Sequence, residues 1–172
     1  MKNKLYSGIL MVTGSFPPDI TGGGIQCSNL LKNLPVGLRN YFCITTTRDK
    51  NLPVKQIEDW GIVYRVFINP QSKISKIKSF FEIIRIFLGI KNKIKIIHLH
   101  SFTSKSVLFV LLASIFKKKI ILKLTSMGDD DPFSIKKRGF GNILYRFYKC
   151  ADVFISVSPG LTEVFKRSEL RD

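Results

Sequence analysis

Short apolar runs alternate with helical patterns along the chain, and this alternation restricts the fold more than any other feature of the sequence. It is typical of a parallel sheet whose strands are joined by crossover helices. The predicted strands are residues 8–13, 41–47, 62–68, 94–100, 119–125 and 153–157. The predicted helices are residues 24–34, 74–90, 104–116, 141–150 and 159–168.

The strand runs are almost continuously apolar, as expected when helices cover both faces of a sheet. We therefore predict an α/β, Rossmann-like, doubly wound fold with a mainly parallel sheet, in a single domain of residues 1–172. Ligands bind such sheets beyond the carboxyl ends of the strands. The informative loops are then residues 14–24, 101–105, 126–133 and 158–160.

Three consecutive glycines, Gly22, Gly23 and Gly24, stand at the start of the first predicted helix. Neither GxGxxG nor GxxxxGK[ST] is present, so the dinucleotide fingerprint and the P-loop are both missing. A helix start offers unpaired N–H groups and a partial positive charge, and glycine lets a ligand approach the backbone closely. The motif predicts a site for an anion such as phosphate; a flexible turn without a ligand is the alternative.

The run IKIIHLHS ends a predicted strand with both histidines of the chain. Because strand side chains alternate, His98 and His100 lie on the same face. His100 is nearer the carboxyl end, where it could hydrogen-bond a sugar or transfer a proton. A packed histidine without a ligand is the alternative for both.

The loop TSMGDDDPF places three carboxylates, Asp129, Asp130 and Asp131, after another predicted strand. Such carboxylates could recognise hydroxyl groups or a cation. Asp131 precedes Pro132, so it could equally be a helix cap or a turn residue. Adjacent aspartates do not by themselves surround a cation, and no metal site is predicted.

The chain carries a formal net charge of +16, and its distribution is uneven. Residues 60–128 contain thirteen Lys or Arg and a single acid, Glu82. This excess indicates an anionic partner: nucleic acid, anionic lipid or a phosphorylated ligand. A solvated basic surface without a partner is the alternative.

The segment SKISKIKSFFEIIRIFLGIKNKIK begins at Ser72. On a helical wheel Lys78, Glu82, Arg85 and Gly89 share one narrow face, and apolar residues fill more of the circumference than one core-facing stripe needs. This pattern is typical of a helix lying on an anionic bilayer. A helix packed on the sheet and against a partner domain is the alternative. The predicted membrane-surface residues are Lys73, Lys76, Lys78, Phe80, Phe81 and Arg85.

Three cysteines, Cys27, Cys43 and Cys150, are far apart in the sequence and form no CxxC pair, which favours reduced thiols in a cytoplasmic protein. The longest apolar run, VLFVLLASIF, has ten residues, about half of what a membrane-spanning helix needs. Near the end of the chain, Ser158 and Pro159 suit the first turn of a helix, which is a structural role.

Taken in order, these motifs resemble the amino-terminal half of a family 4, retaining, GT-B glycosyltransferase. The matching stretches are FPP…GGGIQ…LL…L, IIHLHS, ILKLTSMGDDDP and ADVFISVSPGL. The resemblance implies two Rossmann-like domains, of which the first binds mainly the acceptor and the second most of the nucleotide-sugar. It also implies that Gly22, Gly23 and Gly24 contact the donor phosphate or sugar. The implied acceptor-side residues are His100, Ser101, Ser126, Met127 and Asp130.

The chain departs from that family in two respects. Many members have a histidine where this chain has Met127, so the role of that histidine is not carried over, and no catalytic residue is assigned beyond the candidates His100, Asp129 and Asp130. The chain also stops at Asp172, about where the donor-binding domain should begin. We expect an isolated domain, a truncated gene product or one half of a two-chain enzyme.

The sequence therefore predicts a glycosyltransferase domain that is inactive alone. The complete enzyme would move a sugar from a nucleotide-sugar, with no further cofactor, to a lipid-linked or surface-polysaccharide acceptor at the inner face of the cytoplasmic membrane. Another possibility is a non-catalytic basic module that binds anionic membrane or nucleic acid; nucleic acid is disfavoured because Phe80, Phe81 and Phe87 stand among aliphatic residues. A fragment of a nicotinamide-dependent oxidoreductase is a third possibility, weakened by the missing GxGxxG.

Overall fold

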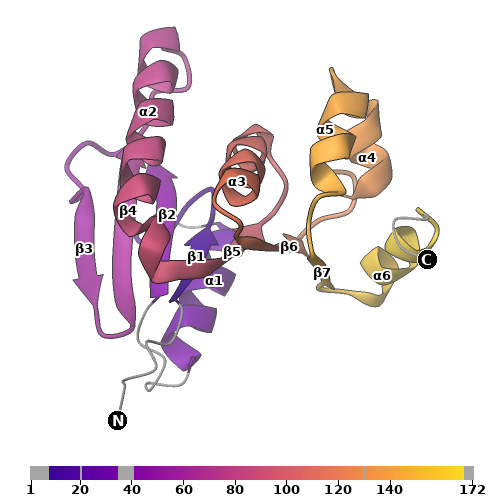
Figure 1. Ribbon diagram of the computed structural model, residues 1–172, viewed down its shortest axis with the longest axis horizontal. Helices are drawn as coiled ribbons and strands as arrows, with labels where there is room; N and C mark the ends of the chain where they lie inside the picture. The colour runs from indigo at the N-terminus through magenta and orange to yellow at the C-terminus, as the bar shows by residue number, and fades with distance from the viewer. Residues whose placement is uncertain (1–7, 20, 35–40, 130, 169–172) are drawn as a thin grey trace. The chain divides into compact units, whose positions relative to one another are not determined.

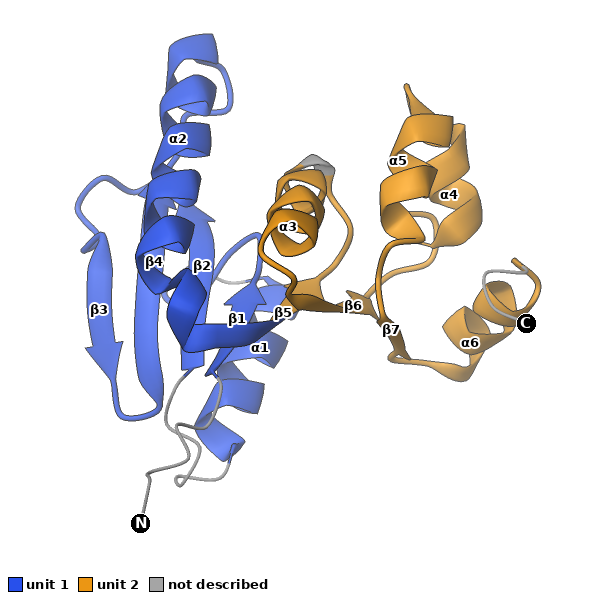
Figure 2. Ribbon diagram, in the orientation of Figure 1, with its two compact units in different colours: residues 1–96 blue, residues 97–172 orange. Residues whose placement is uncertain are grey.

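The computed structural model describes residues 8–19, 21–34, 41–129 and 131–168 (Figure 1). The chain divides into two compact units, residues 1–96 and residues 97–172, which Figure 2 shows in blue and orange. Each unit contains both helices and strands. They are described in turn.

Unit 1 contains the strands β1 (Gly8–Val12), β2 (Tyr41–Thr47), β3 (Lys55–Glu58) and β4 (Gly61–Phe67) in the order β3-β4-β2-β1. The pairs β1–β2 and β2–β4 are parallel, and β3 pairs antiparallel with β4. Two helices, α1 (Gly22–Asn33) and α2 (Lys73–Ile90), connect strands, and the short helix η2 (Lys91–Lys93) leads into β5 (Ile94–His100).

Alternation along the strands gives unit 1 two apolar faces. Met11, Cys43 and Val63 pack in one buried cluster with Cys27 and Leu31 of α1, so α1 covers that face. The residues between them on the strands belong to the opposite face because strand side chains alternate.

Helix α2 lies against β4 and buries a single stripe. The buried side chains are Ser79, Ile83, Ile86, Phe87 and Ile90. The rest of the apolar circumference stays exposed, including Ile74, Ile77, Phe80, Phe81 and Leu88. The helix therefore both packs on the strands and presents an apolar outer surface.

Unit 2 contains the end of β5, then β6 (Lys119–Leu124) and β7 (Val153–Ser156), in the order β5-β6-β7 with β6 and β7 parallel. Its helices are α3 (Ser104–Ile115), α4 (Pro132–Lys137), α5 (Gly141–Tyr148) and α6 (Pro159–Lys166). Buried Tyr148 joins the aromatic core, with ring centroids 5.1 Å from Phe102 and 5.3 Å from Phe154. None of the helices in the described residues is long and apolar enough to cross a membrane.

The Rossmann-like α/β fold with mainly parallel strands is confirmed, and each predicted strand and helix has a counterpart in the structure. Three elements were not predicted: β3, η2 and α4. Strand β3 has only four residues and lies at the end of the strand order, η2 has three residues, and α4 has six and begins inside the loop expected at residues 126–133. Helix α1 begins at Gly22 rather than at residue 24, because Thr21 caps it and the glycines join its first turn.

Candidate functional site

In unit 1 the loop after β1 leads directly into the glycine-rich start of α1. Thr21 is the N-cap residue, and its hydroxyl accepts a hydrogen bond from the Gly24 N–H at 3.2 Å. The Thr21 hydroxyl also hydrogen-bonds the Ser15 hydroxyl across the loop. Among the described residues, no group accepts a hydrogen bond from the N–H of Gly22 or Gly23. These two donors are therefore available to an anion.

The three glycines differ in their surroundings. A Cβ atom at Gly24 would lie 2.7 Å from both the carbonyl and the hydroxyl oxygen of Ser15, so this glycine is required by packing within the chain. A Cβ atom at Gly22 or Gly23 would meet nothing within 4 Å. Gly22 and Gly23 are thus the two positions with open space for a ligand.

Arg65 of β4 braces the same loop, although the sequence prediction did not include it. Its side chain is 3% exposed; Nη2 donates to the Pro17 carbonyl oxygen at 2.7 Å and Nη1 to Gln56 Oε1 at 2.7 Å. The Nε atom has no hydrogen-bond partner among the described residues. A charged residue inside a buried apolar strand was the signal that could have identified it, because such charges are normally paired.

The thiols in this region are inert. Cys27 and Cys43 are buried and free, whereas Cys150 of unit 2 is exposed and free. Burial raises the pKa of the Cys43 thiol well above its usual value, and the neighbouring Cys27 raises it further. Such a thiol stays protonated at neutral pH and is a poor nucleophile.

In unit 2, His98 and His100 lie on the same face of β5, as predicted, with their rings stacked at a centroid distance of 4.4 Å. Both are buried, and His100 is 4% exposed. Neither ring nitrogen of His100, nor Nε2 of His98, has a hydrogen-bond partner among the described residues. Orphaned polar atoms at this depth are uncommon in native proteins, so they call for a water molecule or a ligand group.

The histidines are electrically neutral at physiological pH. Burial lowers the pKa of His98 to about 4, with a contribution from the charge of Lys123. Burial, followed by the charges of His98 and Lys123, lowers the pKa of His100 to about 3. A general base with so low a pKa accepts a proton weakly at pH 7, so the arrangement favours hydrogen bonding to a ligand over proton transfer.

The backbone directly after His100 is held in an unusual conformation. Ser101 has a φ of 92°, a region that non-glycine residues rarely adopt, and its N–H donates to the Lys123 carbonyl oxygen at 3.0 Å. Its own carbonyl oxygen accepts from the Ser106 hydroxyl at 3.2 Å. Such strain at the carboxyl end of a strand is typical of functional sites.

Asp131 has the structural role that was one of its two interpretations. It is the N-cap of α4: Oδ1 accepts from the N–H groups of Phe133 and Ser134, both at 3.0 Å, and Oδ2 accepts from Gly128 N–H at 2.7 Å. Burial by itself would raise the pKa of this carboxyl group, but its hydrogen bonds outweigh burial and lower the pKa. Asp131 is therefore a loop anchor.

The other residues predicted for this loop are more open. Met127 and Asp129 are exposed, and the hydroxyl of Ser126 lies 3.4 Å from Asp129 Oδ2. Asp130 lies outside the described residues. Arg138, which the sequence prediction missed, donates to the carbonyl oxygens of Phe102 and Asp129, so it ties the loop after β5 to the loop after β6.

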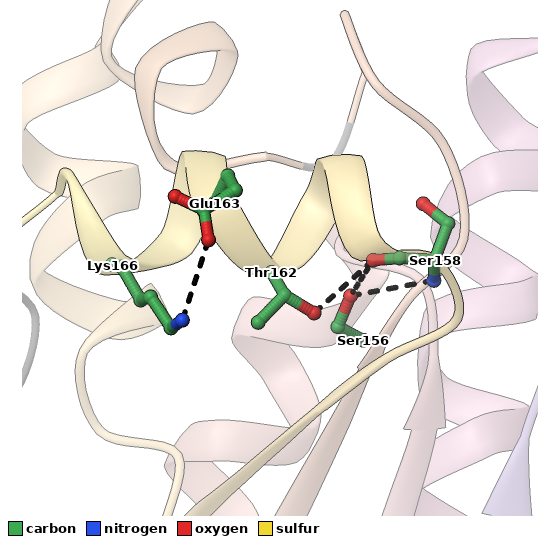
Figure 3. A network of polar contacts seen from close by, with 5 residues as sticks. All are labelled: Ser156, Ser158, Thr162, Glu163 and Lys166. Carbon is green, nitrogen blue, oxygen red and sulfur yellow. Dashed lines mark hydrogen bonds and ion pairs between the residues drawn. The ribbon is translucent and has the colours of Figure 1, made fainter.

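The junction of β7 and α6 is a capped helix start, as the sequence indicated (Figure 3). The Ser158 hydroxyl accepts from Leu161 N–H at 3.3 Å, and Pro159 occupies the first turn. Ser156 and Thr162 both donate hydroxyl hydrogen bonds to the Ser158 carbonyl oxygen, at 2.8 and 3.1 Å. This network organises the backbone at the start of α6.

All six predicted membrane-surface residues of α2 are exposed: Lys73, Lys76, Lys78, Phe80, Phe81 and Arg85. Arg85 forms an ion pair with Glu82, with Nη2 and Oε1 2.5 Å apart. The two phenylalanine rings touch each other edge to face, with centroids 5.6 Å apart. Basic and aromatic side chains thus share the outer surface of one helix.

The glycine turn follows β1 and the paired histidines end β5 of a Rossmann-like fold. A comparison with solved structures identifies the same fold in an enzyme. The chain is similar to sucrose-phosphate synthase from Thermosynechococcus elongatus, a GT-B glycosyltransferase, with a TM-score of 0.69 and 16% sequence identity. No protein-family model matches the chain, and no curated protein matches its sequence.

The similarity covers 94% of this chain and 45% of that enzyme, so this chain spans less than half of the length of the matched protein. At such low identity the likeness establishes the fold alone, a Rossmann-like α/β domain.

Proposed function

We propose that this chain is the acceptor-side domain of a family 4, GT-B glycosyltransferase. The complete enzyme would move a sugar from a nucleotide-sugar to a lipid-linked or surface-polysaccharide acceptor at the inner face of the cytoplasmic membrane. The observation that carries the proposal is the fold similarity to a glycosyltransferase over 94% of the chain. The N–H groups of Gly22 and Gly23, which have no acceptor among the described residues, support a role in contacting the donor phosphate.

The chemistry proposed for these residues is binding and positioning. Gly22 and Gly23 would offer backbone donors to the pyrophosphate, whose negative charge the helix start favours. Neutral His100, together with Ser101 and Ser126, would hydrogen-bond hydroxyl groups of the acceptor. Catalysis by the complete enzyme would rest on orientation and charge stabilisation, and a second domain would supply most donor contacts.

A titration of the ¹⁵N-labelled chain with nucleotide-sugars tests the donor contact. We expect UDP-glucose or GDP-mannose to shift the amide resonances of Gly22 and Gly23, with weak affinity because the second domain is missing from the sample. Free glucose serves as the control. Unshifted glycine resonances with a panel of nucleotide-sugars would remove these residues from the donor site.

A transfer assay tests the need for a second domain. We expect the purified 172-residue chain to transfer no sugar from any nucleotide-sugar to a lipid-linked acceptor. Measurable product would show that these residues contain a complete active site.

A second candidate function is a non-catalytic module that binds anionic membranes, favoured by the exposed basic and aromatic surface of α2. Co-sedimentation with liposomes examines this surface: binding to phosphatidylglycerol liposomes and not to phosphatidylcholine liposomes is expected. Absence of binding to both would exclude the membrane surface and leave the transferase proposal standing. Membrane binding without any response to nucleotide-sugars would favour the module.

A further inference from the structure

Unit 1 contains a groove of about 860 Å³ between α2 and the segment around β4. A volume between roughly 300 and 1,000 Å³ is usual for small-molecule sites. Much of the groove wall is apolar, and α2 contributes three side chains that are more than half exposed to solvent. The apolar side chains of the wall are Val54, Val66, Phe67, Ile74, Ile77 and Phe81.

Positive charge surrounds this apolar wall. Lys50 and Lys78 line the groove, and within the described residues neither forms an ion pair with a carboxylate. The one acid in the wall, Glu82, is already neutralised by Arg85. The Nζ atom of Lys50 lies 5.1 Å from the centroid of the Phe67 ring, so a cation and an apolar ring meet at one point of the wall.

A second cavity, of about 370 Å³, shares Phe67 and Asn69 with the groove and adds Arg48. Arg48 directly follows β2, and Asn69 comes two residues after the end of β4. Because β2 and β4 are parallel, this cavity lies at the carboxyl ends of both strands, where Rossmann-like folds bind their ligands. Lys50 and Arg48 thus lie at the strand end, and Lys78 adds a third cation beside the apolar side chains of α2.

We propose that this groove binds a single anionic lipid, with one hydrocarbon chain along Ile74, Ile77 and Phe81 and the phosphate among the cations Lys50, Lys78 and Arg48. The proposal rests on the proposed function, because it gives the acceptor-side domain a specific site for a lipid phosphate. It differs from adsorption to a membrane surface, since it requires one lipid molecule in a defined groove. The ligand must satisfy both parts of the groove. A simple anion has no hydrocarbon chain for the apolar wall, and a neutral lipid has no phosphate for the cations.

Neighbouring residues of α2 provide matched controls. Phe80 and Phe81 are adjacent and exposed, at 45% and 63%, but only Phe81 lines the groove. Lys76 and Lys78 are both exposed, and only Lys78 lines the groove. Surface adsorption would use both members of each pair, whereas a lipid in the groove would use Phe81 and Lys78.

The test is calorimetric titration of the 172-residue chain with decyl phosphate below its micelle concentration. Decyl maltoside and inorganic phosphate are the neutral and chain-free comparisons. We expect decyl phosphate to bind and Phe81→Ala to weaken its binding roughly tenfold, with Phe80→Ala within about twofold of the original chain. Lys78→Gln should weaken binding more than Lys76→Gln. Ile77→Trp, which fills the groove from an exposed position, should also block binding while far-ultraviolet circular dichroism stays unchanged.

Three results would overturn the groove site: no binding of decyl phosphate, equal losses in Phe80→Ala and Phe81→Ala, or equally tight binding of inorganic phosphate. Equal affinity for decyl maltoside would remove the phosphate from the proposal. The assay uses monomeric ligands, so it is independent of the liposome and nucleotide-sugar experiments. Failure of the groove site would therefore leave the proposed transferase function intact, and failure of the transferase assays would leave the lipid site measurable.

Discussion

At the scale of single residues, the glycine turn contains two different physical requirements within three positions. Gly24 is held close to Ser15, so the chain itself excludes a side chain there. Gly22 and Gly23 face open space, and no group in the described residues accepts a hydrogen bond from their N–H groups. A side chain at Gly22 or Gly23 should therefore raise the stability of the fold and weaken the binding of a ligand.

We expect Gly23→Ala to raise the free energy of unfolding by up to about 1 kcal/mol, because alanine loses less backbone entropy on folding and favours a helix. The same change should weaken binding of a nucleotide-sugar at the helix start. Gly24→Ala should lower stability by about 1–3 kcal/mol through the clash with Ser15. Urea unfolding monitored by circular dichroism measures both; destabilisation by Gly23→Ala would contradict the open space assigned to it.

The buried histidine pair predicts a loss of stability in mild acid. In the folded chain the pKa is about 4 for His98 and about 3 for His100, whereas the ordinary value is 6.5. Between these pKa values and pH 6.5 the unfolded chain therefore binds more protons than the folded chain. Their contribution is present above pH 6.5 and declines as the pH falls towards those values, by up to about 1.4 kcal/mol per pH unit for each histidine.

The measurement is the urea midpoint between pH 7 and pH 4.5 for the original chain and for His100→Asn. The variant should show a shallower decline with falling pH, because one of the two protonation sites is gone. Parallel declines would show that other groups cause the acid sensitivity. A general destabilisation by the substitution would lower the urea midpoint equally at pH 7 and at pH 4.5, so it would not change the slope of the midpoint against pH.

The sequence predicted some of the residues of the candidate site and missed others. The two-residue spacing predicted that His98 and His100 share a face, and the helix start predicted unpaired N–H groups at the glycines. It did not indicate the bracing roles of Arg65 and Arg138, because each contacts carbonyl oxygens of residues far away in the chain. Local patterns contain no information on such partners.

At the scale of elements, the strands and long helices followed from apolar periodicity, whereas α4 did not. A helix of six residues has too few apolar positions to show a period, and its formation depends on the cap. Asp131 provides that cap, with two backbone donors from α4 and a third from Gly128. The cap therefore holds both the helix and the loop before it.

Asp131→Ala should lower the free energy of unfolding by about 1–2 kcal/mol, since the side chain that accepts these hydrogen bonds is lost. Asp129→Ala is the matched control: its carboxylate is exposed, and the change should stay within about 0.5 kcal/mol. Chemical denaturation of both variants gives the comparison. Equal stability of the two would show that the cap contributes nothing to α4.

At the scale of the whole molecule, a net charge of +16 should govern association with anionic surfaces. Added salt shortens the screening length from about 10 Å at 0.1 M to about 3 Å at 1 M. We expect binding to phosphatidylglycerol liposomes to weaken steeply over this range, because attraction of the lysines contributes to it. Sedimentation at several salt concentrations measures the dependence, and salt-independent binding would assign the affinity to apolar insertion alone.

The division into two compact units is also a property of the whole chain. It depends on contacts between residues distant in the sequence, so periodicity and turn residues do not signal it. The order of strands and helices could be predicted, because each strand and each crossover helix has its own apolar pattern in the local sequence.

The short strand β3 has a consequence for how copies of this protein behave at high concentration. Its outer edge would otherwise be free to add a strand from another chain and begin an aggregate. Lys55 and Glu58 bound the strand and flank Ile57, which is 78% exposed, while Gln56 is engaged with Glu58 and Arg65 inside the chain. Four residues with charges at both ends make a poor template for strand addition, so an unpaired edge can be exposed without polymerising.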